Sequence, residues 1–193
     1  MNWICVYCGS RLGRDVQYRA ETVAFGRELV RRDIGLVYGG GGVGLMGVLA
    51  ETVLAGDGEV VGVIPAALRR RERPPDGLTE LVVVESMHAR KRQMFDRSEG
   101  FAALAGGLGT LEELFEMLTW AQLGIHDHPC GIVNIDGYYD ELISFLDAAV
   151  AAGFVPEDHR RLLTAHDDPA DLLDEFEAYT PPDCDDQIDI GEP

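Results

Sequence analysis

The stretch FAALAGGLGTLEELFEML, residues 101–118, joins a short apolar run to a helical pattern through a glycine-rich turn. Its first four residues are apolar, which is typical of a strand buried on both faces. Apolar residues then recur at i, i+3, i+4 and i+7, the spacing of a buried helix face, at Leu111, Leu114, Phe115 and Leu118. We therefore predict a strand over 101–104 and a helix over 110–123. A buried strand followed closely by a helix is the repeating unit of a parallel α/β sheet.

The same alternation continues along the rest of the chain. Apolar runs of strand length occupy 3–8, 35–38, 60–64, 81–84 and 131–135. Helical patterns lie near 16–32, 43–56, 86–98 and 138–152, and two more follow near 157–165 and 168–178. Asp168-Pro169 offers the last of these a side-chain cap and a first-turn proline. The pattern predicts an α/β fold, a Rossmann-like doubly wound parallel sheet with helices on both faces.

The chain length sets the domain organisation that we expect. With 193 residues it fits one Rossmann-like domain, which we place at 1–180. Residues 181–193 are acidic, proline-rich at their start and without periodicity, so we expect a disordered tail. The basic stretch 69–75 interrupts the alternation as a loop, either collecting anions or lying simply exposed.

The charge balance is strongly acidic, with 34 Asp and Glu against 16 Lys and Arg and a net charge of −18. Such a surface repels a phosphate backbone, which excludes nucleic acid as the default partner. Lys91 is the only lysine among the basic residues, a composition that fits either a salt-rich cytoplasm or a GC-rich genome. No apolar run approaches the roughly 20 residues that span a bilayer, and the first residues lead directly into a strand-like segment. We expect a cytoplasmic protein without membrane contact.

The cysteine and histidine pairs do not have the spacing of a metal centre. Cys5 and Cys8 form C-x-x-C within an apolar strand, which favours core thiols over a redox or zinc motif. His126 and His128 have no acidic or thiol cluster near them in sequence, so we interpret them as part of a turn.

Ligands of open parallel sheets bind at the carboxyl ends of the strands, and three turns there carry chemical signals. The first is YGGGGVGLMG, residues 38–47, in which Gly42, Gly44 and Gly47 fit G-x-G-x-x-G. We reject a dinucleotide site, because the next strand ends without the carboxylate that would hold the ribose. Successive glycines such as Gly40 and Gly41 either admit a ligand to the backbone or form a tight turn.

The second turn is the glycine loop 105–110 that opens the helix at 110–123. Its free N–H groups and the helix dipole would hold a phosphate, with the Thr110 hydroxyl as a further donor. Acidic residues in a first helical turn are often only dipole partners, and that interpretation suits Glu112. Glu113 lies nearly opposite the apolar stripe and beside the loop, which favours a catalytic role.

The third signal is on the helix near 86–98, where two cations occupy the stripe that should be apolar. Met87, Arg90, Lys91 and Met94 share one face. Charges turned toward a core need an anionic partner. That partner is either Glu113, in a structural ion pair, or a bound anionic ligand. The position of the only lysine favours the ligand.

At these motifs the chain resembles the LOG family of cytokinin riboside 5′-monophosphate phosphoribohydrolases, formerly labelled lysine decarboxylases. The family carries Y-G-G-G-x-x-G-L-M-G, M-H-x-R-K and P-G-G-x-G-T-x-x-E, and the counterparts here are 38–47, 87–91 and 106–113. The resemblance implies a homodimer that hydrolyses the N-glycosidic bond of N6-modified adenosine 5′-monophosphates. The products would be a cytokinin-type purine base and ribose 5-phosphate, formed without metal or organic cofactor.

The resemblance also implies roles for individual residues. The catalytic Arg and Glu of the family fall on Arg90 and Glu113. Our substrate-binding candidates combine the family contacts with the glycines of the turns, and are Gly40, Gly41, Glu72, Lys91, Gly106, Gly107, Leu108, Gly109, Thr110, Glu112 and Thr119. Ala105 replaces the family proline that opens the loop, which would loosen the turn without removing a donor. We expect activity to survive this change.

Two other hypotheses belong to different functional classes. A non-catalytic nucleotide or cofactor carrier of the same fold would need the glycine loop but not the Arg90–Glu113 pair. A pyridoxal-dependent decarboxylase would need a Schiff-base lysine, for which Lys91 is the only candidate, and usually a larger chain.

Overall fold

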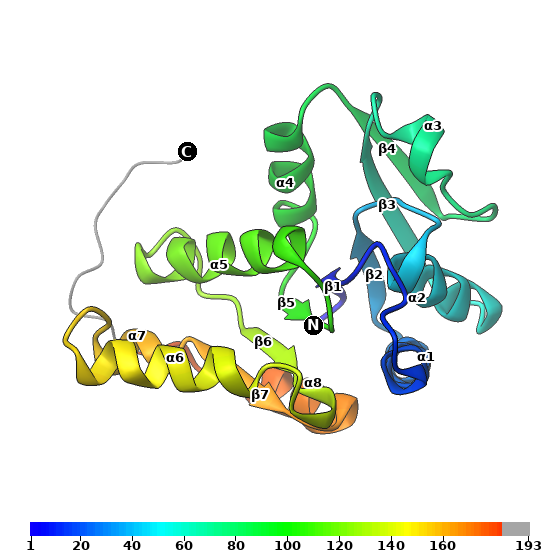
Figure 1. Ribbon diagram of the computed structural model, residues 1–193. Coiled ribbons are helices and arrows are strands. Elements are labelled where there is room, and N and C mark those ends of the chain that lie inside the picture. Colours follow the sequence, from blue (N-terminus) through cyan, green and yellow to red (C-terminus); the bar gives the residue numbers. More distant parts are fainter. Residues whose placement is uncertain (183–193) are drawn as a thin grey trace.

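The structure is a computed structural model, and it describes residues 1–182. A seven-stranded sheet in the order β4-β3-β2-β1-β5-β6-β7 forms its centre (Figure 1), and all neighbouring strands are parallel. The strands are β1 (Trp3–Tyr7), β2 (Gly35–Tyr38), β3 (Val60–Pro65), β4 (Glu80–Val84), β5 (Phe101–Ala103), β6 (Cys130–Val133) and β7 (Leu163–His166). The predicted α/β parallel sheet is confirmed.

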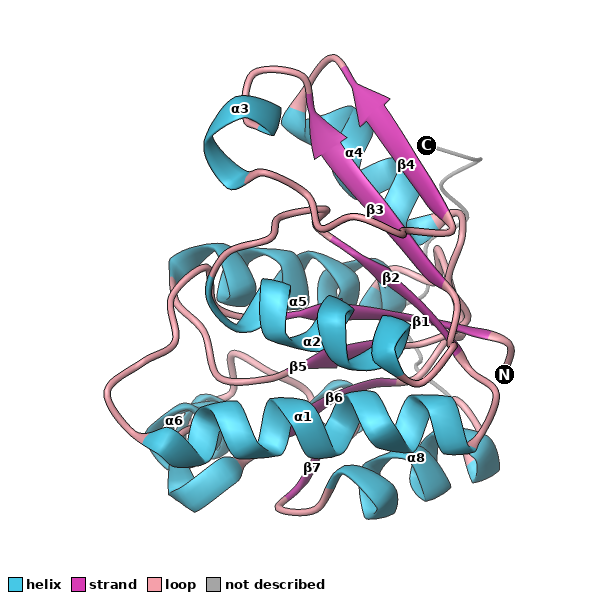
Figure 2. Ribbon diagram, turned by 90° about the vertical axis from the view of Figure 1, so that its right-hand side faces the viewer, coloured by secondary structure: helices cyan, strands magenta, loops and turns pink. Residues whose placement is uncertain are grey.

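Helices cover both faces of this sheet. They are α1 (Val16–Arg31), α2 (Gly44–Ala55), α3 (Arg69–Glu72), α4 (Met87–Phe95), α5 (Leu108–Gln122), α6 (Asp140–Ala151), α7 (Glu157–Arg160) and α8 (Pro169–Ala178), with a 3-10 turn η1 at Ile135–Gly137. Figure 2 shows α1 and α2 on one face and α4 and α5 on the other. Side chains of a strand alternate between faces, so Ile4 and Val6 join one core cluster while Cys5 and Tyr7 join the other.

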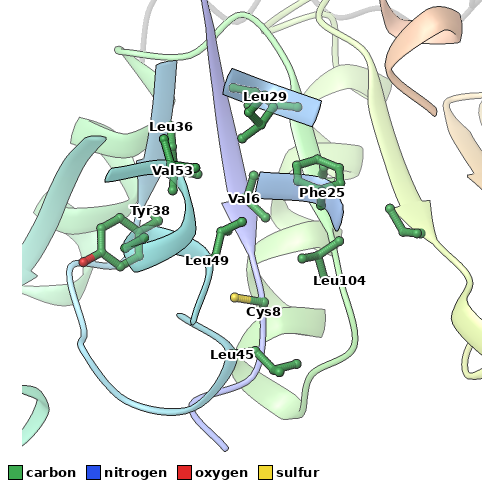
Figure 3. Close-up of a cluster of buried hydrophobic side chains, with 14 of the residues drawn as sticks. Val6, Cys8, Phe25, Leu29, Leu36, Tyr38, Leu45, Leu49, Val53 and Leu104 are labelled. Atoms are coloured by element: carbon green, nitrogen blue, oxygen red, sulfur yellow. The ribbon is translucent and has the colours of Figure 1, made fainter. Parts of the chain in front are cut away.

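The cluster under α1 and α2 shows how the apolar periodicity becomes packing (Figure 3). Phe25 and Leu29 of α1 are fully buried one turn apart, and Leu49 of α2 is equally buried. They pack against β-strand residues such as Val6 and Leu36. Each buried side chain of this size contributes roughly 1.5–3 kcal/mol by leaving water.

Side-chain caps begin three of the helices. Asp15 accepts a hydrogen bond from the Gln17 N–H, and Ser86 accepts one from the Ala89 N–H. Asp168 accepts from the Ala170 N–H with Pro169 in the first turn, as the sequence predicts.

One predicted helix is wrong. The stretch 157–165 contains only the short α7 and then enters β7, which pairs with β6 in register from Cys130 opposite Leu163. The four residues Leu-Thr-Ala-His of β7 are too few to show a period that separates strand from helix, and here pairing with the edge of β6 decides. The basic stretch treated as a loop contains one helical turn, α3.

Burial agrees with the interpretation of the cysteines as core thiols. Cys5, Cys8 and Cys130 are free and buried. Cys184 and residues 183–193 of the expected tail lie outside the described residues. Within 1–182, no helix is both long and apolar enough to cross a membrane.

We predict that Leu172→Ala destabilises the protein by about 2–5 kcal/mol, because Leu172 is fully buried where α8 covers β6 and β7. Urea denaturation measures the change. Phe154→Ala is the control, since it removes an aromatic ring that is 86% exposed and changes stability little. Equal losses in the two variants would contradict the packing of α8 on the sheet.

Candidate functional site

The candidate site lies beside β1, where the order in which successive strands join the sheet reverses. From β1 the chain adds β2, β3 and β4 on one side, and β5 then returns to pair with β1 on the other. The loops that follow β1 and β5 therefore lie side by side, and the Gly9 N–H donates to the Ala105 carbonyl at 3.0 Å. Such a crevice is the usual ligand site of an open α/β sheet.

A cavity of about 320 Å³ opens at this crevice. Seven of the predicted site residues line it: Glu72, Arg90, Gly107, Leu108, Gly109, Thr110 and Glu113. They come from α3, from α4 and from α5 with its N-cap Gly107, so tertiary packing brings together three separate segments of the chain.

Glu113 projects from α5 into this cavity and is nearly buried, with a side chain 12% exposed. Burial raises the pKa of its carboxyl to about 7, although the positive charge of Arg90 acts in the opposite direction. A carboxyl with its pKa near neutrality can be ionised or protonated at the working pH, which is a requirement for acid–base chemistry.

Arg90 faces Glu113 from α4, with 3.8 Å between its Nη2 and the Glu113 Oε1. Its side chain is only 8% exposed, and its Nε is buried without a hydrogen-bond partner. A Cβ on Gly39 would lie 1.8 Å from Nη2, so the absent side chain at the end of β2 makes room for the guanidinium. Arg90 and Glu113, which the sequence analysis offered as a possible ion pair, therefore face each other inside the cavity.

Glu72 closes the cavity from α3. Its Oε2 is buried without a partner and would lie 3.0 Å from a Cβ on Gly41. The Gly42 N–H donates to the Glu72 carbonyl at 2.7 Å and anchors α3 to the glycine turn. Buried polar atoms without partners are rare, so an unmatched acceptor here and an unmatched donor on Arg90 favour a polar ligand between them.

The glycine turn after β2 mainly makes room for the protein itself. A Cβ on Gly42 would lie 2.2 Å from the Arg73 carbonyl oxygen, and one on Gly44 would lie 2.2 Å from Ser10. Gly40 has a left-handed backbone, with φ of 72°. Neither Gly40 nor Gly41 lines the cavity, and their contact with a ligand stays a prediction.

The glycine loop after β5 opens α5 without a side-chain cap. Gly107 is the N-cap, and its carbonyl accepts from the Leu111 N–H at 3.1 Å. The first four N–H groups of a helix have no partner within it, so those of residues 107–110 are available to an anion. Gly106 lines an adjoining cavity of about 570 Å³ that shares Ser10, Gly107 and Leu108 with the first.

Besides Gly40, Gly41 and Gly106, three more predicted ligand contacts lie outside the cavity: Lys91, Glu112 and Thr119. Lys91 binds Glu112 and Glu116, and Thr119 donates to the Phe115 carbonyl on an exposed part of α5. Partial burial lowers the pKa of Lys91, but its hydrogen bonds to the two carboxylates outweigh this and raise the pKa above its ordinary value. Arg90 and Lys91 are neighbours in sequence, yet only Arg90 reaches the cavity.

The sequence analysis missed the contribution of the first strand. Cys8 and Ser10 line the cavity from the loop after β1, with Met46, Leu68 and Met87 as apolar walls. Gly9-Ser10 after an apolar strand was the available signal, but its nearness to the glycine loop depends on strand order.

The histidine pair lies in the turn before β6. His126 Nε2 is hydrogen-bonded to the Met117 carbonyl at 2.9 Å, and its Nδ1 accepts from the His128 N–H. Within residues 1–182, no three His, Cys, Asp or Glu side chains are grouped to hold a metal ion.

Comparison with known families agrees with the three motifs. The family described as "Possible lysine decarboxylase" matches residues 46–176. A rice protein (Oryza sativa subsp. japonica) named "Probable cytokinin riboside 5'-monophosphate phosphoribohydrolase LOGL9" is 50% identical over 92% of this chain and 78% of its own length. Arabidopsis thaliana LOG1, named as a cytokinin riboside 5'-monophosphate phosphoribohydrolase, is 47% identical over 92% and 84% of the two chains.

The chain belongs to the LOG family. Among solved structures, a molybdenum cofactor binding protein from Rippkaea orientalis matches with a TM-score of 0.68, at 18% identity over 92% of this chain and 96% of that one. The molybdenum cofactor carrier protein of Chlamydomonas reinhardtii matches with a TM-score of 0.66 at 16% identity, over 92% of this chain and 99% of that one. At such identities the likeness shows that this LOG protein shares their fold, and nothing about ligands.

We predict that Glu113→Gln stabilises this LOG protein more at pH 8 than at pH 5. The native carboxyl holds its proton up to about pH 7, whereas its ordinary pKa is 4.5, so the wild type loses stability as pH rises through this window. Glutamine stays neutral, and its advantage grows by on the order of 3 kcal/mol across the window. Thermal unfolding of both proteins at the two pH values measures it. A difference independent of pH would contradict the burial of an ionisable carboxyl.

Proposed function

We propose that this protein hydrolyses the N-glycosidic bond of adenosine 5′-monophosphates, including N6-modified ones, to the free purine base and ribose 5-phosphate. The observation that carries the proposal is the nearly buried Glu113 carboxyl, 3.8 Å from the Arg90 guanidinium and in one cavity with the glycine loop. Relatives 47–50% identical over 92% of the chain bear the name of this activity.

The chemistry of the bond explains why a carboxylate is needed. Breaking C1′–N9 builds positive charge on the ribose and leaves the electron pair on the departing base. Ionised Glu113 stabilises the developing cation and orients the attacking water, whose oxygen bonds to C1′. The near burial of the Glu113 side chain strengthens this attraction. The proton that the water loses balances the proton that the departing base gains, so the products are the neutral purine base and ribose 5-phosphate.

The remaining contacts place the nucleotide. Free N–H groups of the glycine loop bind the 5′-phosphate at the N-terminus of α5, with the Thr110 hydroxyl beside them. Arg90 supplies its unmatched Nε donor to the nucleotide, and Glu72 supplies its unmatched acceptor. The cavity walls formed by Met46, Leu68 and Met87 suit the face of a purine.

The ion pairs of Lys91 are evidence against a pyridoxal-dependent decarboxylase. Its only candidate lysine, Lys91, is held as an ammonium by Glu112 and Glu116, and a Schiff base requires a neutral amine. A carrier would not need a carboxyl with a pKa near 7 against a buried arginine.

We propose further that the protein is a cytoplasmic homodimer and that nucleic acid is not a partner. Lys91 and Thr119, to which the family resemblance assigns ligand contacts, lie outside the cavity of their own chain, and Thr119 is on an exposed part of α5. Free buried thiols suit a reducing compartment. The net charge of −18 opposes binding to a polyanion.

We predict that the protein releases adenine from AMP, and isopentenyladenine from its 5′-monophosphate, but turns over adenosine far more slowly. Chromatography of the base and of ribose 5-phosphate, at low and at molar salt, measures the reaction. Glu113→Gln lowers kcat by about 10²–10⁴-fold without loss of nucleotide binding. In the wild type, kcat/KM falls as pH drops below about 7, where Glu113 becomes protonated.

Two other outcomes would contradict parts of this proposal. Adenosine turnover at the rate of AMP would contradict a phosphate-binding role for the glycine loop. Binding of AMP without turnover in either salt would favour the carrier hypothesis.

We predict that Gly39→Ala lowers kcat/KM for AMP at least tenfold, because the added Cβ would overlap the Arg90 guanidinium. Arg90→Ala lowers it by about a hundredfold or more. The double variant should be no worse than Arg90→Ala alone, since the alanine at 39 then meets no guanidinium. Additive losses in steady-state kinetics would show that Gly39 acts otherwise than through Arg90.

A further inference from the structure

The loop that follows β5 is held by its carbonyl groups. The Tyr139 hydroxyl donates to the Leu104 carbonyl at 2.7 Å, and the Gly9 N–H donates to the Ala105 carbonyl at 3.0 Å. The Tyr138 hydroxyl donates to the next carbonyl, that of Gly106. Three successive peptide units are therefore oriented by groups outside the loop, although Ala105 stands where a proline would have stiffened it.

The last of these bonds sets the direction of a phosphate donor. In a planar trans peptide the C=O and the following N–H point in opposite directions. With its carbonyl held by Tyr138, the Gly106–Gly107 unit turns the Gly107 N–H away from Tyr138. Gly107 is the N-cap of α5, so this N–H belongs to the donor set that the helix leaves free.

This peptide unit has unusual freedom to rotate, because both of its residues are glycine. The Thr110 side chain requires glycine at position 106 for space, since a Cβ there would lie 2.1 Å from its Oγ1. A Cβ on Gly107 would meet no atom within 4 Å, so nothing packs against that end. Rotation of the unit would present a carbonyl oxygen to the phosphate in place of an N–H, and the hydrogen bond from Tyr138 opposes it.

Tyr138 is itself fixed from two sides. The preceding turn places Asp136 and Gly137 at φ of 49° and 69°, and a Cβ on Gly137 would lie 2.5 Å from the Asp140 carboxylate. The Tyr138 ring packs edge-on against Tyr18 of α1, with 5.3 Å between ring centroids and an interplanar angle of 74°. These contacts position the hydroxyl, while the residue stays 42% exposed at the rim of the cavity beside the site.

We propose that Tyr138 is a positioning residue for the phosphate of the substrate, acting through the Gly106 carbonyl to keep the Gly107 N–H aimed at it. The proposal rests on the proposed function, in which the glycine loop binds the 5′-phosphate. A donor oriented before binding loses less freedom on binding, so the hydroxyl contributes affinity for phosphate in particular.

Tyr138→Phe tests this, because it keeps the ring against Tyr18 and removes only the hydroxyl. We expect the Kd for inorganic phosphate and for ribose 5-phosphate, measured by calorimetry, to rise about fivefold, the size of one modest hydrogen bond. KM for AMP should rise by a similar factor with kcat changed less than twofold. Adenosine binding and the melting temperature should stay near the wild-type values.

Two matched variants separate positioning from stability. Tyr139→Phe removes the hydroxyl that holds Leu104 in the core, and it should lower the melting temperature without the phosphate-selective loss. Tyr18→Phe keeps the ring that supports Tyr138 and should behave as wild type.

Wild-type phosphate affinity in Tyr138→Phe, or an equal loss for phosphate and adenosine, would overturn the proposal. Failure of the proposed function would give a different result. A wild type that binds phosphate but does not hydrolyse AMP would contradict the proposed function, and the phosphate titration would still test the role of Tyr138. A wild type that binds no phosphate would overturn both.

Discussion

The parallel pairing of β5 with β1 reverses the direction in which the sheet grows, and the site depends on that reversal. Helices that follow neighbouring strands usually block the space above them. Where the order reverses, the two following helices, α1 and α5, leave on opposite faces and the loops between them stay open. The cavity with Ser10, Gly107 and Glu113 occupies this opening.

Around this opening the protein keeps two charges nearly out of water. The Arg90 and Glu113 side chains are 8% and 12% exposed, and their 3.8 Å separation is longer than a hydrogen bond. Desolvation of both groups is unfavourable, and a pair at this distance offsets only part of it. The structure thus holds an incompletely satisfied pair at the site, as expected where a ligand completes the polar contacts rather than where a salt bridge stabilises the fold.

The glycines around the cavity serve this arrangement in different ways. Gly39 leaves space for Arg90, and Gly42 and Gly44 let neighbouring loops approach. Gly106 and Gly107 instead form a peptide unit whose orientation depends on Tyr138. A glycine count in the sequence cannot separate these roles, because each depends on which atom lies opposite the missing Cβ.

The parallel α/β fold, most helix bounds and the cap at Asp168 were predictable from the amino-acid sequence, because periodicity, capping and residue type act locally. The same local reasoning singled out Arg90 and Glu113 as candidate site residues. Tertiary structure alone decided the rest. The strand β7 forms by pairing with the edge of β6. Lys91 forms ion pairs with Glu112 and Glu116, whereas Arg90, one residue earlier, lines the cavity. Ser10 and Tyr138 likewise reach the glycine loop only through strand order and the turn after β6. Contacts between residues far apart in the chain follow from packing, and packing is absent from any local pattern of residues.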